Sequence, residues 1–302
     1  MDHIRLAING FGRIGRITFR ALLKSKTIEL IAVNDLADAE TLAHLVKYDS
    51  VHGEFHGRIK AHNDFFVVNG KKIHTFSDNR PENLPWKELD IDVVIESTGE
   101  FTTRQQASQH LHAGAKRVII SAPAKGPDED VKFIVMGINE SILSRDDVII
   151  SNSSCTTNCV APLIKILDDN WGIDEAFITT VHSYTRDQNL IDGPHKDLRR
   201  GRAAACSIIP TTTGAAKASS RIFPHLKANL GGAGIRVPVA NGSLTDLTCT
   251  VQIPTTVQLI NAAFKKASRG AFRRILQYTE DPIVSADVIG NPHSAIFDAG
   301  LT

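Results

Sequence analysis

The chain has 302 residues, 42% of them hydrophobic and 22% charged, which is typical of a globular protein with room for two domains. Lysine and arginine number 34 against 33 acidic residues, and this balance argues against a nucleic acid or an anionic membrane as partner. The four cysteines, none in a C-x-x-C pair, do not suggest a disulfide framework.

The N-terminal residues do not resemble a targeting segment. They lack the apolar run and small-residue cleavage site of a signal peptide, and no apolar segment approaches the ~18 uninterrupted residues of a membrane span. We therefore expect a protein of the reducing cytoplasm with no membrane partner.

The first half of the chain alternates short apolar strands with helices. Expected strands cover residues 4–8, 28–33, 93–95, 118–120, 133–136 and 148–150, and expected helices cover 12–25, 39–47 and 103–113. Such alternation predicts an α/β domain with a doubly wound parallel sheet.

The second half has longer and more widely spaced strands, expected at 176–182, 234–239 and 244–253. Helices are expected at 155–170 and 256–271. This pattern predicts an α+β domain with a mixed or antiparallel sheet and helices on one face. We place the domain boundary near Ser151, giving domains of residues 1–152 and 153–302.

A glycine-rich turn follows the first expected strand. Gly10, Gly12 and Gly15 form G-x-G-x-x-G at the start of a helix, and Asp35 closes the second strand twenty residues after Gly15. Gly10 permits the tight turn, Gly12 admits a pyrophosphate, and Gly15 allows close helix packing. Asp35 can accept hydrogen bonds from ribose hydroxyls. A plain glycine turn is the alternative, but the complete context predicts a Rossmann domain that binds NAD.

Cys155 is the candidate nucleophile. It follows a polar run, residues 151–154, and precedes an apolar run, residues 159–164, which places it at a helix N-terminus. The N–H groups there stabilise a thiolate and can form an oxyanion hole. Cys159, one turn further on, and likewise Cys206 and Cys249 are expected to be buried, inert thiols.

His182 is the candidate base. It ends an expected strand and enters a polar loop, so it can point into a cleft and form a Cys–His couple. Spacing alone favours the alternative, an ordinary loop histidine.

Two segments are candidates for binding anions. A hydroxyl cluster at residues 211–217 precedes a small-residue helix, and Arg236 lies inside an apolar strand, where it needs an anionic partner or an exposed face. For Arg199 and Arg200 a solvated loop or a subunit interface is favoured. His110 and His112 do not share a helix face, and no paired Cys/His spacing occurs, so no metal site is expected.

These segments together resemble the glyceraldehyde-3-phosphate dehydrogenases over nearly the whole chain. The matching motifs are N-G-F-G-R-I-G-R at 9–16, V-N-D at 33–35, E-S-T-G at 96–99, S-C-T-T-N at 154–158, T-G-A-A-K at 213–217 and R-V-P at 236–238. The S-C-T-T-N segment is the most specific of them.

The resemblance implies a role for each matched position. The implied cofactor contacts are Gly10, Gly12, Arg13, Ile14, Gly15, Asn34, Asp35, Thr98 and Ser121. The implied catalytic pair is Cys155 and His182. Thr185 and Arg236 match contacts to the substrate's phosphate. The implied environment of the attacking phosphate is Ser154, Thr156, Arg202, Thr213 and Gly214.

The implied function is oxidative phosphorylation of D-glyceraldehyde 3-phosphate to 1,3-bisphosphoglycerate, with NAD⁺ as oxidant and a Cys155 thioester. The family is typically a homotetramer, with residues 184–202 near a subunit interface. Asp35 and Pro194 favour NAD, with NADP as the alternative. Erythrose-4-phosphate dehydrogenase is a second candidate. A catalytically impaired NAD-binding relative is a third, because family members continue for some tens of residues beyond Thr302.

Overall fold

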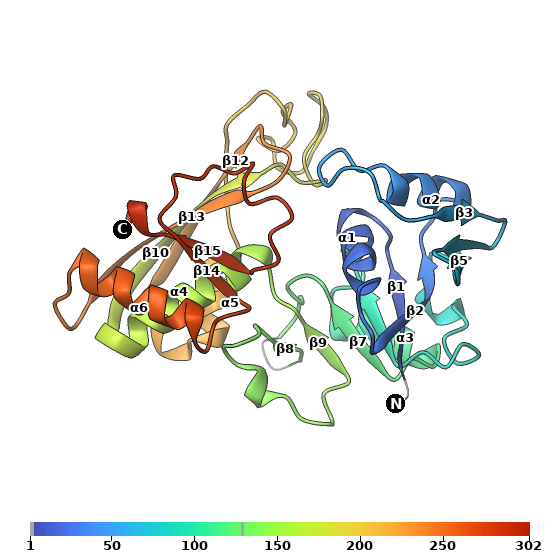
Figure 1. Cartoon of the computed structure of the whole chain (residues 1–302), viewed down its shortest axis with the longest axis horizontal. Coiled ribbons are helices and arrows are strands. Elements are labelled where there is room, and N and C mark those ends of the chain that lie inside the picture. Colours follow the sequence, from blue (N-terminus) through green and yellow to red (C-terminus); the bar gives the residue numbers. More distant parts are fainter. Residues whose placement is uncertain (1–2, 128–129) are drawn as a thin grey trace. The chain divides into compact units, whose positions relative to one another are not determined.

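The structure is a computed structural model that describes residues 3–127 and 130–302. The chain folds into two compact units (Figure 1). The first unit comprises Met1–Ile134 and Ile142–Ser153, and the second comprises Val135–Ser141 and Ser154–Thr302. The chain therefore enters the second unit twice. The expected single boundary near Ser151 did not anticipate the early segment Val135–Ser141.

In the described part of the first unit, nine strands form one sheet in the order β3-β4-β5-β2-β1-β6-β7-β9-β8. The parallel strands are β1 (Ile4–Asn9), β2 (Ile28–Asn34), β5 (Lys71–Phe76), β6 (Val93–Glu96), β7 (Arg117–Ile120), β8 (Lys132–Phe133) and β9 (Ile149–Ser151). Because β2 and β6 flank β1 on opposite sides, the strand order reverses at β1, where α/β sheets bind their ligands. The predicted doubly wound sheet is confirmed.

One edge of this sheet was not predicted. β3 (Ile59–Ala61) and β4 (Phe65–Val68) run antiparallel and join the sheet through β5. Asn69 and Gly70 make the turn between β4 and β5 with φ of +51° and +86°. This Asn-Gly pair is a hairpin signal that could have revealed the strands. The expected strand 133–136 is wrong beyond Phe133, where β8 ends.

Two helices of the first unit, α2 (Ala39–Lys47) and α3 (Arg104–His112), begin at side-chain caps. The unit also contains α1 (Arg13–Leu22) and a short 3₁₀ helix η1 (Pro81–Asn83). Asp38 caps α2 through the N–H of Thr41, and Thr103 and Gln106 form a capping box on α3. These caps satisfy N–H groups that have no partner inside the helix.

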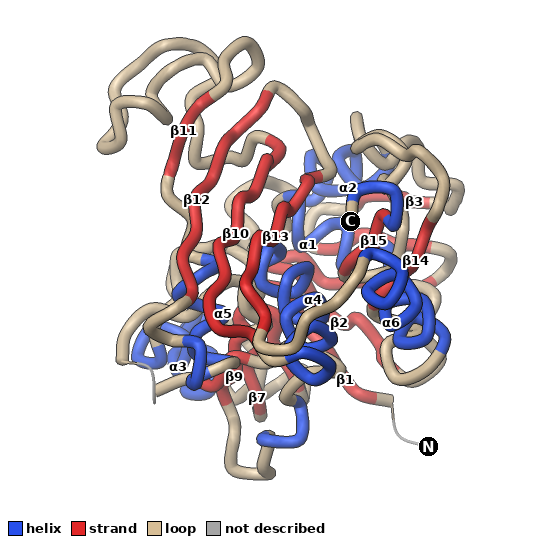
Figure 2. The backbone as a smooth tube through the Cα atoms, turned by 90° about the vertical axis from the view of Figure 1, so that its left-hand side faces the viewer, coloured by secondary structure: helices blue, strands red, loops and turns tan. Residues whose placement is uncertain are grey.

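The second unit is built on a mixed sheet in the order β11-β12-β10-β13 (Figure 2). Its strands are β10 (Ile173–Ser183), β11 (Ile209–Thr211), β12 (Leu230–Val237) and β13 (Ser243–Val251), and a separate parallel pair is β14 (Leu276–Thr279) and β15 (Ala295–Asp298). β10 runs parallel to β12 and antiparallel to β13. The predicted mixed sheet is confirmed.

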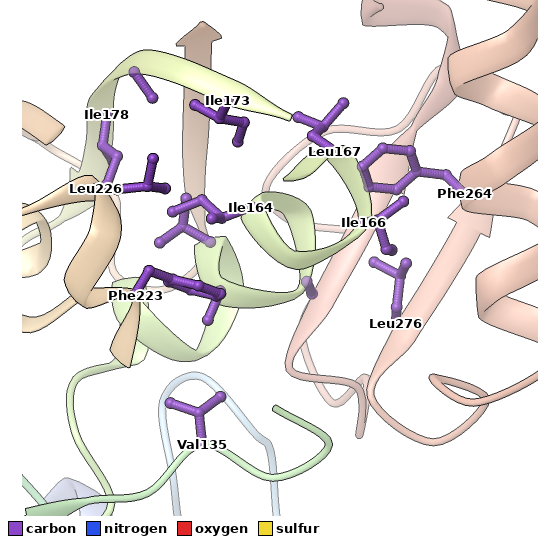
Figure 3. Packing of buried hydrophobic residues seen from close by; sticks show 14 of the residues in the cluster. Val135, Ile164, Ile166, Leu167, Ile173, Ile178, Phe223, Leu226, Phe264 and Leu276 are labelled. Carbon is purple, nitrogen blue, oxygen red and sulfur yellow. The ribbon is translucent and has the colours of Figure 1, made fainter. Parts of the chain in front are cut away.

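Helices cover this sheet and fill its core. They are α4 (Cys155–Trp171), α5 (Ala215–Ile222) and α6 (Val257–Arg269), with 3₁₀ helices η2 (Glu140–Ile142), η3 (Pro224–Leu226) and η4 (Ala299–Leu301). Ile164 of α4 is fully buried among Phe223, Leu226 and Val135 (Figure 3). Val135 comes from the early segment Val135–Ser141, so that segment completes the core of the second unit.

None of the helices in the described part of the chain combines the length and hydrophobicity needed to cross a lipid bilayer.

Candidate active site

The dinucleotide turn follows the end of β1. Gly10 has φ of +87°, and a Cβ at this position would lie 2.5 Å from the backbone nitrogen of Thr98. A Cβ on Gly15 would lie 2.2 Å from the carbonyl oxygen of Gly10. Only glycine fits at either position, because the chain must turn left-handed at Gly10 and α1 must pack directly on that turn.

Gly12 differs from Gly10 and Gly15, because protein packing does not require glycine at this position. It is the N-cap of α1, and a Cβ built on it would meet no described protein atom within 4 Å. No protein group therefore requires glycine here, whereas a bound phosphate that approaches the backbone would. The first turn of α1 offers N–H groups and a positive dipole end to such an anion.

Asp35 lies at the end of β2 and reaches the same turn. Its Oδ2 accepts the Phe11 N–H at 2.7 Å, and its Oδ1 accepts the Ala37 N–H at 3.3 Å. An ionised carboxylate can accept about four hydrogen bonds, so capacity remains for ribose hydroxyls. The turn, the helix N-terminus and Asp35 together fit the pyrophosphate and ribose of NAD.

The other predicted cofactor residues surround this turn. Arg13 and Ile14 begin α1, and Ser121 follows β7, where its N–H donates to the Glu96 carbonyl at 2.9 Å. Asn34 is buried and donates to the side chain of Asn9 at 2.7 Å. This bond ties the end of β2 to the end of β1 beside the turn, and the cofactor contact of Asn34 stays a prediction.

Cys155 is the first residue of α4, as the sequence predicted. The hydroxyl of Ser154, the N-cap, accepts the Thr157 N–H at 3.0 Å. The preceding Ser153 is buried and has φ of +59°, a conformation that non-glycine residues rarely adopt. This sharp turn places the sulfur at the first turn of the helix, near its positive end.

His182 contacts the cysteine directly. Its Nε2 lies 3.3 Å from Sγ of Cys155, although the two residues are 27 positions apart. On the other side of the ring, Nδ1 lies 2.7 Å from the carbonyl oxygen of Ser183. With a proton on Nδ1 donated to that carbonyl, Nε2 is free to accept the thiol proton. The ordinary-loop interpretation of His182 is therefore wrong.

Arg236 is the third member of this group. In the register of β10 and β12 it pairs with His182, and its Nη1 lies 2.5 Å from Nδ1 of His182 and 3.0 Å from the Ser183 carbonyl. Its Nε is buried with no hydrogen-bond partner among the described residues. Burial lowers the pKa of Arg236. A half-buried guanidinium in contact with His182 is suited to an anionic substrate.

The thiol is activated by these neighbours. Burial by surrounding protein atoms raises the pKa of Cys155, but the hydrogen bond and charge of His182 and the hydroxyl and N–H of Thr156 outweigh it. The pKa of Cys155 is thus below its ordinary value, even though its side chain remains open to solvent. Burial raises the pKa of Cys159, which leaves it the inert thiol. The prediction of a buried thiol is wrong for Cys206, which is exposed.

Thr185 lies in a polar network that the sequence analysis did not anticipate. Its hydroxyl donates to the carboxylate of Asp187, which also pairs with Arg200. Arg200 donates in turn to the Thr211 hydroxyl at 2.8 Å. Burial raises the pKa of Asp187, but the Thr185 hydrogen bond and the charges of Arg200 and Arg236 together outweigh burial, so the pKa is below its ordinary value. The solvated-loop interpretation is wrong for Arg200.

The predicted residues for the attacking phosphate lie at several places in the second unit. Thr156 is buried, with Oγ1 4.0 Å from Sγ of Cys155. Thr213 accepts the Ala215 N–H at 3.2 Å, and Gly214 is the N-cap of α5. Arg202 forms an exposed ion pair with Asp192 at 2.9 Å. Their phosphate role stays a prediction.

The described residues contain no cluster of three or more His, Cys, Asp or Glu side chains with the geometry of a metal site.

Comparison with known proteins places these two sites in one family. Residues 4–104 match the sequence model of the glyceraldehyde 3-phosphate dehydrogenase NAD binding domain, and residues 154–302 match that of the C-terminal domain. Glyceraldehyde-3-phosphate dehydrogenase 2 of Streptomyces avermitilis is 53% identical over 301 residues, which cover 99% of this chain and 89% of that protein.

Two further relatives are equally similar. The glyceraldehyde-3-phosphate dehydrogenase 2 of Bacillus subtilis is 51% identical over 300 residues, 99% of this chain and 87% of that protein. The glyceraldehyde-3-phosphate dehydrogenase of Geobacillus stearothermophilus is 53% identical over 297 residues, 98% of this chain and 88% of that protein. The likeness thus extends across both units.

Proposed function

Because this chain belongs to the glyceraldehyde-3-phosphate dehydrogenase family, we propose that Cys155 is its nucleophile and His182 its base. The protein is an NAD-dependent oxidoreductase that converts D-glyceraldehyde 3-phosphate and inorganic phosphate to 1,3-bisphosphoglycerate. The first unit binds NAD, and the second carries out the covalent chemistry. The observation that carries this assignment is the 3.3 Å contact between Sγ and Nε2.

The first step joins the substrate to the enzyme. His182 Nε2 takes the thiol proton, and the sulfur of Cys155 attacks the aldehyde carbon to form a hemithioacetal. The N–H groups at the start of α4 stabilise the oxygen that becomes negative. The environment that lowers the pKa of Cys155 favours this proton transfer.

The second step is oxidation, and the third is phosphorolysis. The chemistry that NAD⁺ supplies when bound is acceptance of a hydride from the carbon attached to Cys155. Cys155 then holds the acyl group as a thioester. An oxygen of inorganic phosphate attacks the thioester carbon, the carbon–sulfur bond breaks, and the acyl phosphate leaves with the thiolate restored.

Cofactor binding falls to the turn and its neighbours. Gly10, Gly12 and Gly15 shape the pyrophosphate site, and Asp35 accepts the ribose hydroxyls. The remaining proposed contacts are Arg13, Ile14, Asn34, Thr98 and Ser121.

Phosphate binding falls to polar groups of the second unit. Arg236 and Thr185 are proposed to bind the substrate's own phosphate, because Arg236 is a half-buried cation in contact with His182 of the catalytic pair. The attacking phosphate is assigned to Ser154, Thr156, Arg202, Thr213 and Gly214.

We also propose a homotetramer. Residues 184–202 form a long loop in which Leu190, Ile191 and Leu198 are 75%, 77% and 84% exposed. Large apolar side chains this exposed on one loop favour an interface with another copy of the chain.

The decisive experiment follows NADH absorbance with D-glyceraldehyde 3-phosphate and NAD⁺, with and without inorganic phosphate. Sustained NADH formation only with phosphate supports the proposed reaction. A rate indifferent to phosphate would instead indicate hydrolysis of the acyl-enzyme, as in erythrose-4-phosphate dehydrogenase. Cys155→Ala, as the matched control, must abolish turnover while leaving NAD binding intact.

A further inference from the structure

Three parallel strands of the first unit end in a row of buried polar residues. Asn34, Asn9 and Glu96 are the last residues of β2, β1 and β6, and Asn9 pairs with each of the other two in the strand register. All three are buried. Polar groups removed from water must find hydrogen-bond partners inside the protein, so a defined network is required here.

Glu96 is the centre of this network. Its Oε2 accepts the Asn9 side-chain N–H at 2.6 Å and lies 3.0 Å from Nε2 of His110. Its Oε1 accepts the Thr98 N–H at 2.8 Å and also the Thr98 hydroxyl. Four donors fill the acceptor positions of one carboxylate, which suits the ionised form.

His110 can serve this carboxylate in one tautomer only. Its side chain, from α3, is 0% exposed, and its Nδ1 lies 3.0 Å from Nε1 of Trp86. An indole N–H only donates, so Nδ1 must be the acceptor. The ring proton is then on Nε2 and is donated to Glu96. Trp86 thus fixes a neutral imidazole, and His110 contributes one of the four donors.

The groups that Glu96 holds form the wall of the dinucleotide turn. The backbone of Thr98 packs so closely on Gly10 that a Cβ there would lie 2.5 Å from its nitrogen. The neighbouring Ser97 hydroxyl donates to the Gly10 carbonyl at 2.7 Å. Asn9, on the other oxygen of Glu96, directly precedes Gly10. Movement of the Glu96 carboxylate would therefore move both sides of the turn.

We propose that His110 and Trp86 are positioning residues of the NAD site. Through the fixed Nε2–H tautomer they hold Glu96, and through Glu96 they hold Thr98 and Asn9 in the geometry that receives the cofactor. This inference rests on the proposed NAD site, and neither residue touches the cofactor.

The test compares two substitutions at one position. His110→Leu removes the donor to Glu96 and the acceptor for Trp86, whereas the amide of His110→Gln can replace both. We expect His110→Leu to raise the Kd of NAD, measured by calorimetry, by about tenfold or more. His110→Gln should stay within a few-fold of the wild-type Kd. The iodoacetamide reaction of Cys155 should be unchanged in both.

Two further measurements keep the inference testable if His110→Leu does not fold. Nitrogen NMR of histidine-labelled wild-type protein at neutral pH should show His110 with its proton on Nε2. Trp86→Phe should weaken NAD binding by at least several-fold while circular dichroism confirms the fold. Wild-type NAD affinity in folded His110→Leu or Trp86→Phe, or an Nδ1-protonated His110, would overturn the inference. Absence of NAD binding by the wild-type protein would overturn the proposed site itself.

Discussion

At the scale of single residues, the proposed reaction depends on the contacts of His182, which lies beside the sulfur of Cys155. Nε2 of His182 faces the sulfur as the proposed base, and Nδ1, the other ring nitrogen, contacts the Ser183 carbonyl and Arg236. Arg236 has only donors, so its contact with Nδ1 suits the state in which the proton is on Nε2, facing the sulfur. The Ser183 carbonyl suits the state with the proton on Nδ1. The Ser183 contact is therefore kept before and after His182 accepts the thiol proton, whereas the Arg236 contact with Nδ1 fits only the neutral ring with its proton on Nε2.

The first prediction concerns the reactivity of Cys155. Because the thiolate is the reactive form and the pKa of Cys155 is lowered, we expect iodoacetamide to alkylate it at least about tenfold faster than the other three thiols near neutral pH. Its rate should fall at a lower pH than that of an ordinary thiol. His182→Gln removes the positive charge that helps to lower this pKa, so the midpoint should move to higher pH.

Mass spectrometry of tryptic peptides over a pH series measures this reaction site by site. Cys159, whose pKa burial raises, is the internal control within the same helix. Equal rates for the two cysteines, or a midpoint unaffected by His182→Gln, would contradict the assigned pair.

At the scale of elements, the strand–turn–helix unit from β1 to α1 separates the demands of folding from those of binding. Gly10 is required by its own backbone conformation and by the backbone of Thr98. Gly12 touches no described atom at the position of a Cβ. A sequence pattern treats the two glycines alike, but the structure gives them different tasks.

A matched pair of substitutions tests this difference. Gly10→Ala should lower the free energy of unfolding by more than about 1–3 kcal/mol, because it combines a strained φ with a backbone clash. Gly12→Ala should change it by less than about 1 kcal/mol and yet weaken NAD binding, because its methyl group lies where the pyrophosphate approaches. Thermal denaturation and calorimetry measure the two effects. Wild-type NAD affinity in Gly12→Ala would contradict the assigned role.

The elements also show what could be predicted from sequence and what could not. Local signals located α1, α2 and the start of α4, because glycine turns, polar caps and apolar periodicity act over a few residues. The pairing of His182 with Arg236 spans 54 residues and depends on the strand order of the second sheet. Spacing along the chain carries no information on that order.

Residues behind the site were missed for a related reason. Glu96 was seen only as part of the E-S-T-G motif, Trp86 was not singled out, and His110 was considered only as a metal ligand. Their roles depend on three elements meeting in one buried place. The available signal was a carboxylate at the end of an apolar strand, which requires buried partners.

At the scale of the whole molecule, the proposed tetramer can be tested on its exposed loop. We expect multi-angle light scattering to give the mass of four chains for the wild-type protein. Ile191→Asp, on the loop of residues 184–202, should yield smaller species, because a charge would be buried at the interface. Val284→Asp, at an apolar position that is 64% exposed and lies outside the loop, is the control and should leave the mass unchanged. A monomeric wild type, or an unaltered mass for Ile191→Asp, would contradict the proposal.

The segment Val135–Ser141 has a consequence for dissecting this protein. Val135 packs with Ile164 and Phe223 in the core of the second unit, although it precedes the last strand of the first unit in the chain. If the chain were cut between Ser153 and Ser154, the C-terminal fragment would have a cavity in its core where Val135 packs. The N-terminal fragment would carry the segment Val135–Ser141 without the core that this segment packs against. During synthesis, the segment Val135–Ser141 leaves the ribosome before most of the residues of the core that it completes. Because each unit is made of two separate segments of the chain, a chimera with a single junction cannot exchange one whole unit.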